Sequence, residues 1–202
     1  MEKYFSREFQ LTSNDVNLEI LQHTVGDVGC VVWDAALVLG AYLDHMNQTG
    51  QIPVKNRRIL ELGSGTGFVG LVAAALGGDC LMTDLPEMVP LIKRNLFKNT
   101  PLLQGAGSAK AFEWGSDMSG LVSHTDKGFD IVLAADCIYY KESLNAFISY
   151  EDRESEEKKT LIADFFERIK KSCCVSKVPY EHYRNDFRCE DIHIFKITYL
   201  KT

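Results

Sequence analysis

The 202-residue sequence (1–202) predicts a single α/β domain built around a doubly wound, mostly parallel β-sheet. Short apolar runs alternate along the chain with longer segments whose apolar residues recur at helical spacing. Glycines gather directly after one of these runs, in "LELGSGTGFVG" (60–70), and such a strand-to-helix turn is typical of a nucleotide site. We therefore expect a ligand at the carboxyl ends of the strands.

The first fifty residues predict a β-hairpin followed by a helix. "REFQL" (7–11) and "NLEIL" (17–21) alternate apolar and polar residues on either side of the turn-type cluster "TSND". Residues 26–46 then place apolar side chains at helical spacing. We expect this N-terminal part, residues 1–50, to cover the ligand site.

The rest of the chain predicts alternating strands and helices. The run 129–140 is apolar on both faces, as buried parallel strands are. Pro86 is expected near the first turn of its helix, where proline is tolerated. Pro90 is expected within the first turn or so, or else at a kink of the helix. The expected elements are strand 57–62, helix 68–78, strand 80–85, helix 86–99, strand 108–114, strand 129–140, strand 147–154, helix 156–172 and strand 190–200.

Composition and charge argue against several classes of function. A net charge of −6 disfavours nucleic acid as the main partner and suits a basic substrate such as a lysine side chain. No stretch approaches the ~20 apolar residues of a membrane span, and the N-terminal residues have no apolar core of signal length. None of the six cysteines forms a C-x-x-C pair, so we expect no metal. Free thiols and a cytoplasmic monomer are the further expectations.

Two glycine patterns overlap in the turn and indicate different cofactors. Gly65, Gly67 and Gly70 fit the dinucleotide pattern G-x-G-x-x-G, whereas Gly63, Gly65 and Gly67 fit G-x-G-x-G. Glu61 decides between them, because a carboxylate would repel a pyrophosphate and attract the ammonium and sulfonium groups of S-adenosylmethionine (SAM). The sequence therefore favours SAM as cofactor, the plain alternative being a tight turn without a ligand.

The end of the second strand of this unit supports the same interpretation. Asp84 follows the glycine turn at about the spacing of ~20 residues at which an acidic residue meets a ribose. Its carboxylate can accept hydrogen bonds from both ribose hydroxyls. We expect Asp84 to hold the cofactor ribose.

Four segments of the chain carry a resemblance to a known family: "DVGCVVWDAALVL", "ILELGSGTGFVGLVAA", "FDIVLAADCIYYKESL" and "YRNDFRCEDIHIF". In these segments the sequence resembles the seven-β-strand (class I) SAM-dependent methyltransferases. It is most similar to the protein-lysine methyltransferases that modify chaperones and AAA ATPases, and among them to the branch acting on valosin-containing protein. The resemblance implies a Rossmann-like fold, SAM as cofactor, and valosin-containing protein or a similar ATPase or chaperone as the protein substrate.

The resemblance also implies roles for individual residues. Trp33 would pack near the methionine moiety of SAM, and Trp114 would lie beside the adenine. The family's D-x-x-Y motif is present as Asp136 to Tyr139, which implies that Asp136 and Tyr139 are the catalytic residues. The cofactor-binding residues implied are Trp33, Glu61, Gly63, Ser64, Gly65, Asp84, Leu85, Trp114 and Ala135.

These residues also have plainer interpretations. Trp33 and Trp114 are large aromatics that often serve only as core anchors. Asp136 is harder to explain structurally, because a carboxylate at the end of a buried strand must be paired or serve a ligand. In the family's chemistry Asp136 would attract the lysine ammonium, while the ring and hydroxyl of Tyr139 would shape the lysine channel.

One region departs from the family pattern. The resemblance implies that a full helix begins at the segment "KESL", whose last residue is Leu144. In this chain "FISYEDRE" (147–154) follows that segment almost at once. A parallel crossover normally needs a dozen or more residues. We therefore expect a shortened crossover, partial exposure of Ile131 and Leu133 or their neighbours, and a weak or inactive enzyme. The alternatives are a non-catalytic binding protein of this fold, a methyltransferase acting on another protein or a small molecule, and a nicotinamide oxidoreductase, which Glu61 disfavours.

Overall fold

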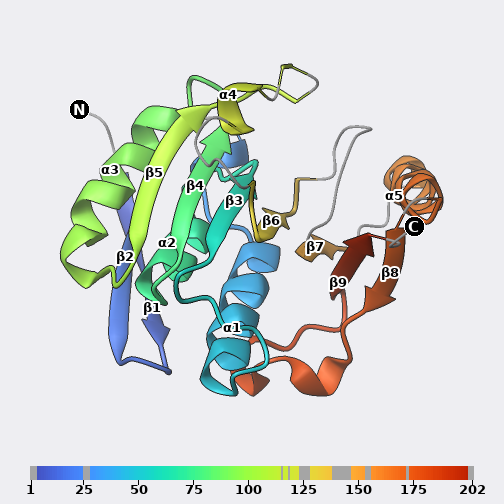
Figure 1. Cartoon of the computed structure of the whole chain (residues 1–202), viewed down its shortest axis with the longest axis horizontal. Helices are drawn as coiled ribbons and strands as arrows, with labels where there is room; N and C mark the ends of the chain where they lie inside the picture. Colours follow the sequence, from blue (N-terminus) through green and yellow to red (C-terminus); the bar gives the residue numbers. More distant parts are fainter. Residues whose placement is uncertain are drawn as a thin grey trace.

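The main sheet of the protein has seven strands, arranged in the order β5-β4-β3-β6-β7-β9-β8 (Figure 1). The computed structural model describes residues 4–24, 28–114, 116–117, 119–122, 128–137, 147–152, 156–171 and 173–199. The strands are β3 (Arg58–Leu62), β4 (Asp79–Asp84), β5 (Ala106–Ala111), β6 (Ile131–Ala135), β7 (Phe147–Glu151), β8 (Cys173–Lys177) and β9 (Ile192–Tyr199). The five strands β5, β4, β3, β6 and β7 run parallel, and β9 is antiparallel to both β7 and β8. The predicted mostly parallel sheet is confirmed.

Helices cover both faces of this sheet, as a doubly wound fold requires. One buried cluster includes residues of α1 (Asp34–Gln48), α2 (Phe68–Ala75) and α3 (Val89–Asn99). A second includes residues of α4 (Ser119–Val122) and α5 (Glu156–Ile169). Leu60 and Leu62 of β3 belong to the second cluster and Ile59 to the first, because successive strand residues point to opposite faces.

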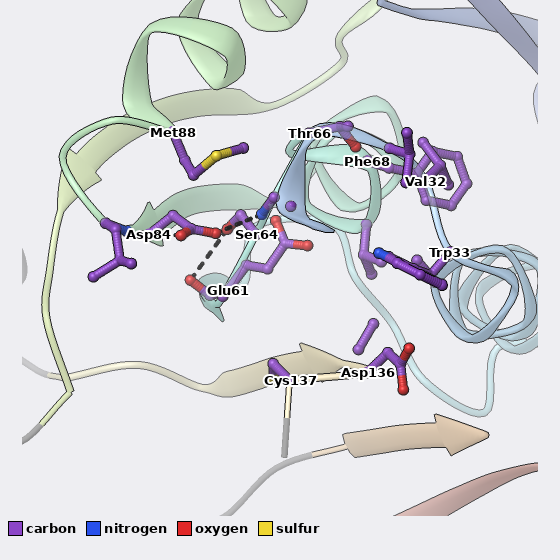
Figure 2. Close-up of a pocket in the computed structure, with 18 of the residues that line it drawn as sticks. Val32, Trp33, Glu61, Ser64, Thr66, Phe68, Asp84, Met88, Asp136 and Cys137 are labelled. Carbon is purple, nitrogen blue, oxygen red and sulfur yellow. Dashed lines mark hydrogen bonds between the residues drawn. The ribbon is translucent and has the colours of Figure 1, made fainter. Parts of the chain in front are cut away.

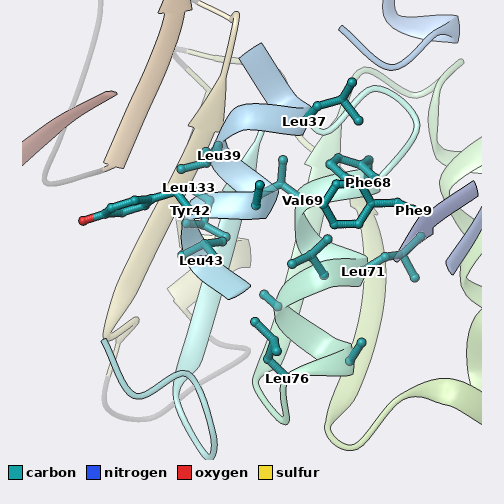
Figure 3. Close-up of a cluster of buried hydrophobic side chains, with 14 of the residues drawn as sticks. Phe9, Leu37, Leu39, Tyr42, Leu43, Phe68, Val69, Leu71, Leu76 and Leu133 are labelled. Carbon is teal, nitrogen blue, oxygen red and sulfur yellow. The ribbon is translucent and has the colours of Figure 1, made fainter. Parts of the chain in front are cut away.

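The packing of α1 against α2 forms the centre of the first cluster (Figure 3). Helix α2 is buried along its whole length, which explains why it consists of small and apolar residues. Gly40 of α1 allows the close approach, since a Cβ there would lie 2.8 Å from the ring of Phe68. This contact fixes the start of α2, and with it the end of the glycine turn.

The predicted N-terminal hairpin is also confirmed. Strands β1 (Tyr4–Leu11) and β2 (Val16–His23) pair antiparallel as a separate two-stranded sheet. Its turn is fastened to α1 by Asp44, a fully buried residue whose carboxylate accepts hydrogen bonds from the Thr12 N–H and hydroxyl at 2.7 and 2.8 Å. The alternation of the two strands buries one face of the hairpin against the domain.

Several elements differ from the sequence prediction. Helix α3 begins at Val89, so Pro90 lies in its first turn and Pro86 precedes it. Strand β5 ends at Ala111, which leaves Trp114 beyond the strand. Strand β8 was not predicted, because its short sequence "CCVSK" is a mostly exposed edge strand without clear alternation.

The connection between β6 and β7 is short, as predicted. The two strands are parallel neighbours, and only residues 136–146 separate the end of β6 from the start of β7. The expected exposure is found at Ile131 and its neighbour Val132, which are partly exposed, but it is wrong for Leu133, which is fully buried in the cluster that contains α1. Leu133 points to the face covered by α1, so it does not depend on a helix in the connection (Figure 3). Tyr139 and Leu144 lie outside the described residues.

Candidate active site

A cavity of about 590 Å³ lies at the carboxyl ends of β3, β4 and β6 (Figure 2). Its wall is completed by residues that follow β5 and by the segment leading into α1. Ten of the eleven predicted site residues line it: Trp33, Glu61, Gly63, Ser64, Gly65, Asp84, Leu85, Trp114, Ala135 and Asp136. The eleventh, Tyr139, lies outside the described residues.

The glycine turn adopts backbone conformations that other residues rarely reach. Gly63, Gly65 and Gly67 have φ of 60°, 54° and 81°, in the left-handed region. Gly65 also passes directly beneath Gly29, since a Cβ on Gly65 would lie 2.9 Å from the Gly29 carbonyl oxygen. The turn therefore needs glycine both for its shape and for the segment packed over it.

Ser64 fixes the turn to the neighbouring strand. Its N–H donates to the Thr83 carbonyl at 3.0 Å, and its Oγ accepts a hydrogen bond from the Thr83 N–H at 3.0 Å. The Thr83 hydroxyl in turn donates to the Glu61 carbonyl at 2.7 Å. The ends of β3 and β4 are thereby locked together under the cavity.

Glu61 is a buried carboxylate at the floor of the cavity. It is 3% exposed, and its Oε2 accepts a hydrogen bond from the Gly70 N–H at 3.0 Å. Burial raises the pKa of Glu61 to about 8; hydrogen bonds from Ser64 and Gly70 oppose this shift, and the nearby Asp84 adds to it. A carboxylate in this environment is stabilised by taking up a proton or by an adjacent cation.

Asp84 ends β4 and uses its carboxylate to shape the same site. Its Oδ2 accepts a hydrogen bond from the Gly65 N–H at 2.6 Å, and its Oδ1 accepts one from the Leu85 N–H at 2.7 Å. A carboxylate has about four lone-pair positions, so Asp84 retains acceptor capacity for a ligand. Figure 2 shows Asp84 beside Ser64 and Glu61.

The cavity is lined by carboxylates and by no basic side chain among the described lining residues. The acidic residues are Glu61, Asp84, Glu87, Glu113 and Asp136. The sequence did not single out Glu87 and Glu113, although Glu87 follows the predicted strand 80–85 closely. Glu113 falls within the predicted strand 108–114, but β5 ends at Ala111. Such a site attracts cations and disfavours phosphates.

Two tryptophans form part of the wall. Trp33 directly precedes α1, and its indole nitrogen points toward the cavity (Figure 2). Trp114 lies near the glycine turn, since its Cζ2 would be 3.8 Å from a Cβ on Gly63. Both rings are partly exposed, so neither is only a buried core anchor. Met88 and Phe112 also line the cavity and were not predicted.

Asp136 follows β6 in an unusual backbone conformation. Its φ is 50°, in the left-handed region that aspartate tolerates better than most residues, and its N–H donates to the Ser149 carbonyl at 2.8 Å. The next residue, Cys137, has its pKa raised to about 12 by burial and by Glu61, Asp136 and Asp84. Cys137 therefore carries a neutral thiol and is a poor nucleophile.

The residues present fit SAM. Glycines bring the backbone close to the ligand, the buried and partly exposed carboxylates match its ammonium and sulfonium charges, and Asp84 can accept hydrogen bonds from ribose hydroxyls. The five carboxylates, with no basic side chain among the described lining residues, disfavour the phosphates of a P-loop or pyrophosphate ligand. Across the described residues no group of three metal-ligating side chains is placed to hold a metal, and no helix is long and apolar enough to cross a membrane.

Comparison with known proteins gives a consistent family. A family model described as lysine methyltransferase matches residues 12–173. The chain is 30% identical to protein N-lysine methyltransferase METTL21A of Danio rerio, over 95% of this chain and 86% of that protein. It is 34% identical to EEF1A lysine methyltransferase 3 of Mus musculus, over 68% and 61% of the two chains.

Solved structures agree on the fold. A Thermus thermophilus 16S rRNA N2 G1207 methyltransferase, determined in complex with AdoMet and guanosine, aligns with a TM-score of 0.56 and 14% identity. The alignment covers 98% of this chain and 51% of that one, so this chain spans about half the length of that enzyme. Together with the SAM-compatible cavity, the family match leads to one conclusion: the chain belongs to the class I, SAM-dependent protein-lysine methyltransferases.

Proposed function

We propose that this chain methylates a lysine side chain of valosin-containing protein or of a similar AAA ATPase or chaperone. The observation that carries the proposal is the cavity lined by five carboxylates and, in its described part, by no lysine or arginine. Both the cofactor and a lysine ammonium are cations, so the same acidic lining suits both reactants. The substrate class follows the sequence resemblance in the segments around Trp33 and Asp136.

The proposed cofactor site uses the residues that line the floor and one wall of the cavity. Glu61 faces the ammonium end of SAM, with the turn at Gly63 and Gly65 beneath it. Asp84 holds the ribose, and Trp114 lies beside the adenine. The support for these roles is that these residues line one cavity and that Glu61 is buried there.

The proposed catalytic residues follow β6. When bound, SAM supplies an electrophilic methyl group on its sulfonium. A lysine has an ordinary pKa of about 10.4 and arrives charged, so the site must attract the ammonium and then favour its neutral form. Asp136 attracts and orients the ammonium, and the apolar wall near Trp33 excludes water, which lowers the lysine pKa so that the proton leaves to solvent. Tyr139 shapes the lysine channel, a role that rests on the D-x-x-Y motif alone.

A second candidate substrate comes from the comparisons. EEF1A lysine methyltransferase 3 is named for elongation factor 1A, and it is one of the relatives above 30% identity. The assay that separates the candidates incubates the purified chain with labelled SAM and, separately, recombinant valosin-containing protein, a chaperone and elongation factor 1A. Label on a lysine of the first or second protein, mapped by mass spectrometry, is the expected result.

Two outcomes of this assay would contradict the proposal. Label on elongation factor 1A alone would replace the substrate, and intact SAM binding without label on any protein of a whole lysate would indicate a weak or non-catalytic protein. The second outcome has a specific structural motive, because only residues 136–146 connect β6 to β7 beside Asp136. We further propose that the enzyme is a cytoplasmic monomer, consistent with its six free cysteines and testable by cell fractionation and light scattering.

A further inference from the structure

Two asparagines of α3 bind the outer edge of the N-terminal hairpin. Asn95 accepts a hydrogen bond from the Leu21 N–H at 2.7 Å and donates to the Leu21 carbonyl at 3.0 Å. Asn99 repeats the arrangement with the N–H and carbonyl of Glu19, at 3.0 and 2.9 Å. The side-chain amides therefore pair with β2 as a neighbouring strand would.

The spacing of the two asparagines explains this match. Residues four apart in a helix are separated by about 6 Å along the axis. Residues two apart in a strand are separated by about 6.8 Å. Asn95 and Asn99 can thus each reach one of two strand residues that point the same way, and both amides are buried, at 0% and 1% exposure.

The third hydrogen bond of each amide distinguishes the two residues. Asn99 donates to the Asn95 carbonyl of its own helix at 2.8 Å, whereas Asn95 donates to the Thr66 carbonyl at 2.9 Å. Thr66 belongs to the glycine turn, is buried and lines the cavity. Gly70 is the third residue of α2, so its N–H has no partner within the helix, and it donates to the Glu61 carboxylate instead. Thr66 precedes the helix cap, Gly67. Asn95 thus donates a hydrogen bond to the Thr66 carbonyl, whereas an N–H of the first turn of α2 donates to the Glu61 carboxylate.

The hairpin in turn holds the segment that lies over the glycine turn. Gln22, the neighbour of Leu21 in β2, is buried and accepts a hydrogen bond from the Val32 N–H at 2.7 Å. Val32 lines the cavity, and the Gly29 carbonyl lies directly over Gly65. Fixing β2 therefore also fixes the upper wall of the cavity.

We propose that Asn95 is a positioning residue for the cofactor. Its single amide bonds both the glycine turn, through Thr66, and β2, through Leu21, and so ties together the two segments that hold the cavity lining. It acts through these backbone groups and does not contact the cofactor. The inference rests on the proposed cofactor site, and Asn99 offers a matched control because it lacks only the bond to the turn.

The experiment compares Asn95→Ala with Asn99→Ala. Each variant loses two hydrogen bonds to β2 from an equally buried position, so we expect similar decreases in melting temperature. Calorimetric titration with SAM and with S-adenosylhomocysteine, below the melting transition, should give about tenfold weaker binding for Asn95→Ala and less than twofold for Asn99→Ala. A purely structural role predicts equal changes in affinity for the two variants.

Equal dissociation constants in the two variants, whether changed or unchanged, would overturn the proposal. If Asn95→Ala does not fold, Asn95→Ser and Asn99→Ser replace the pair of alanine variants. Failure of both Asn95 variants to fold would show that Asn95 has a general structural role, and it would reject the specific role in positioning the cofactor. The readout is binding, so loss of protein methylation with intact SAM affinity in the parent chain would contradict the proposed function alone. Absence of SAM binding by the parent would contradict the cofactor site itself.

Discussion

Replacement of Glu61 by glutamine should stabilise the cofactor-free protein at pH 8. The folded chain holds the pKa of Glu61 at about 8, against an ordinary value of 4.5, because the carboxylate is buried. Between these values the folded state binds one more proton than the unfolded state, so stability is lost as the pH rises. From pH 6 to pH 8 this single group should lower the free energy of unfolding by about 2 kcal/mol.

Glu61→Gln removes this pH dependence. The glutamine oxygen can still accept the Gly70 N–H, and the side chain remains neutral at all pH values. Urea unfolding of the wild type and the variant at pH 6, 7 and 8 measures the difference in slope, in which the other titrating groups cancel. Glu113→Gln, which removes an exposed carboxylate of the same cavity, is the control and should keep the wild-type slope.

The affinity for the cofactor should rise with pH, whereas the stability of the cofactor-free protein falls. An ammonium beside Glu61 lowers its pKa, so binding below pH 8 should release up to one proton and tighten by up to tenfold for each unit of rising pH. Calorimetry in two buffers of different ionisation enthalpy counts that proton. Glu61→Gln should bind SAM roughly thirtyfold more weakly at pH 7.5, about 2 kcal/mol, without proton release. Parallel stability slopes in wild type and Glu61→Gln would refute the reasoning.

Three further changes test the remaining parts of the site. Asp84→Ala should weaken SAM binding by about 2–4 kcal/mol, measured by calorimetry, and wild-type affinity would remove Asp84 from the ribose site. Asp136→Asn should abolish methyl transfer while SAM affinity changes only a few-fold, and unchanged turnover would exclude its catalytic role. A helix of about 15–20 residues inserted after Leu144 should raise melting temperature and turnover, and equal values for both chains would show that the short connection is harmless.

The sequence predicted the cavity well because its acidic residues lie at or next to the carboxyl ends of strands. Parallel strands bring their carboxyl ends to one edge of the sheet, so Glu61, Asp84 and Asp136 meet although they are far apart in the chain. The glycine pattern then identified the turn between them. For these positions, local spacing and the parallel topology were sufficient.

Other features depend on contacts that no local pattern encodes. Asn95 looks like an ordinary helical residue in the sequence, and its partners Leu21 and Thr66 are 74 and 29 residues away. Strand β8 is an edge strand whose mostly exposed residues need not alternate. The burial of Leu133 was mispredicted because the sequence indicates a strand but not which face α1 covers.

The burial of Glu61 has two opposite effects: it strengthens the attraction for a cation, and it lowers the stability of the cofactor-free protein as the pH rises. At the floor of the cavity it is shielded from water, so it attracts an adjacent cation far more strongly than the exposed lining residues Glu87 and Glu113 would. The same burial destabilises the empty protein as the pH rises. The hydrogen bond from Gly70 limits this destabilisation, because it favours the charged carboxylate. The cofactor-free protein should therefore be least stable at the pH where its attraction for a cation is greatest.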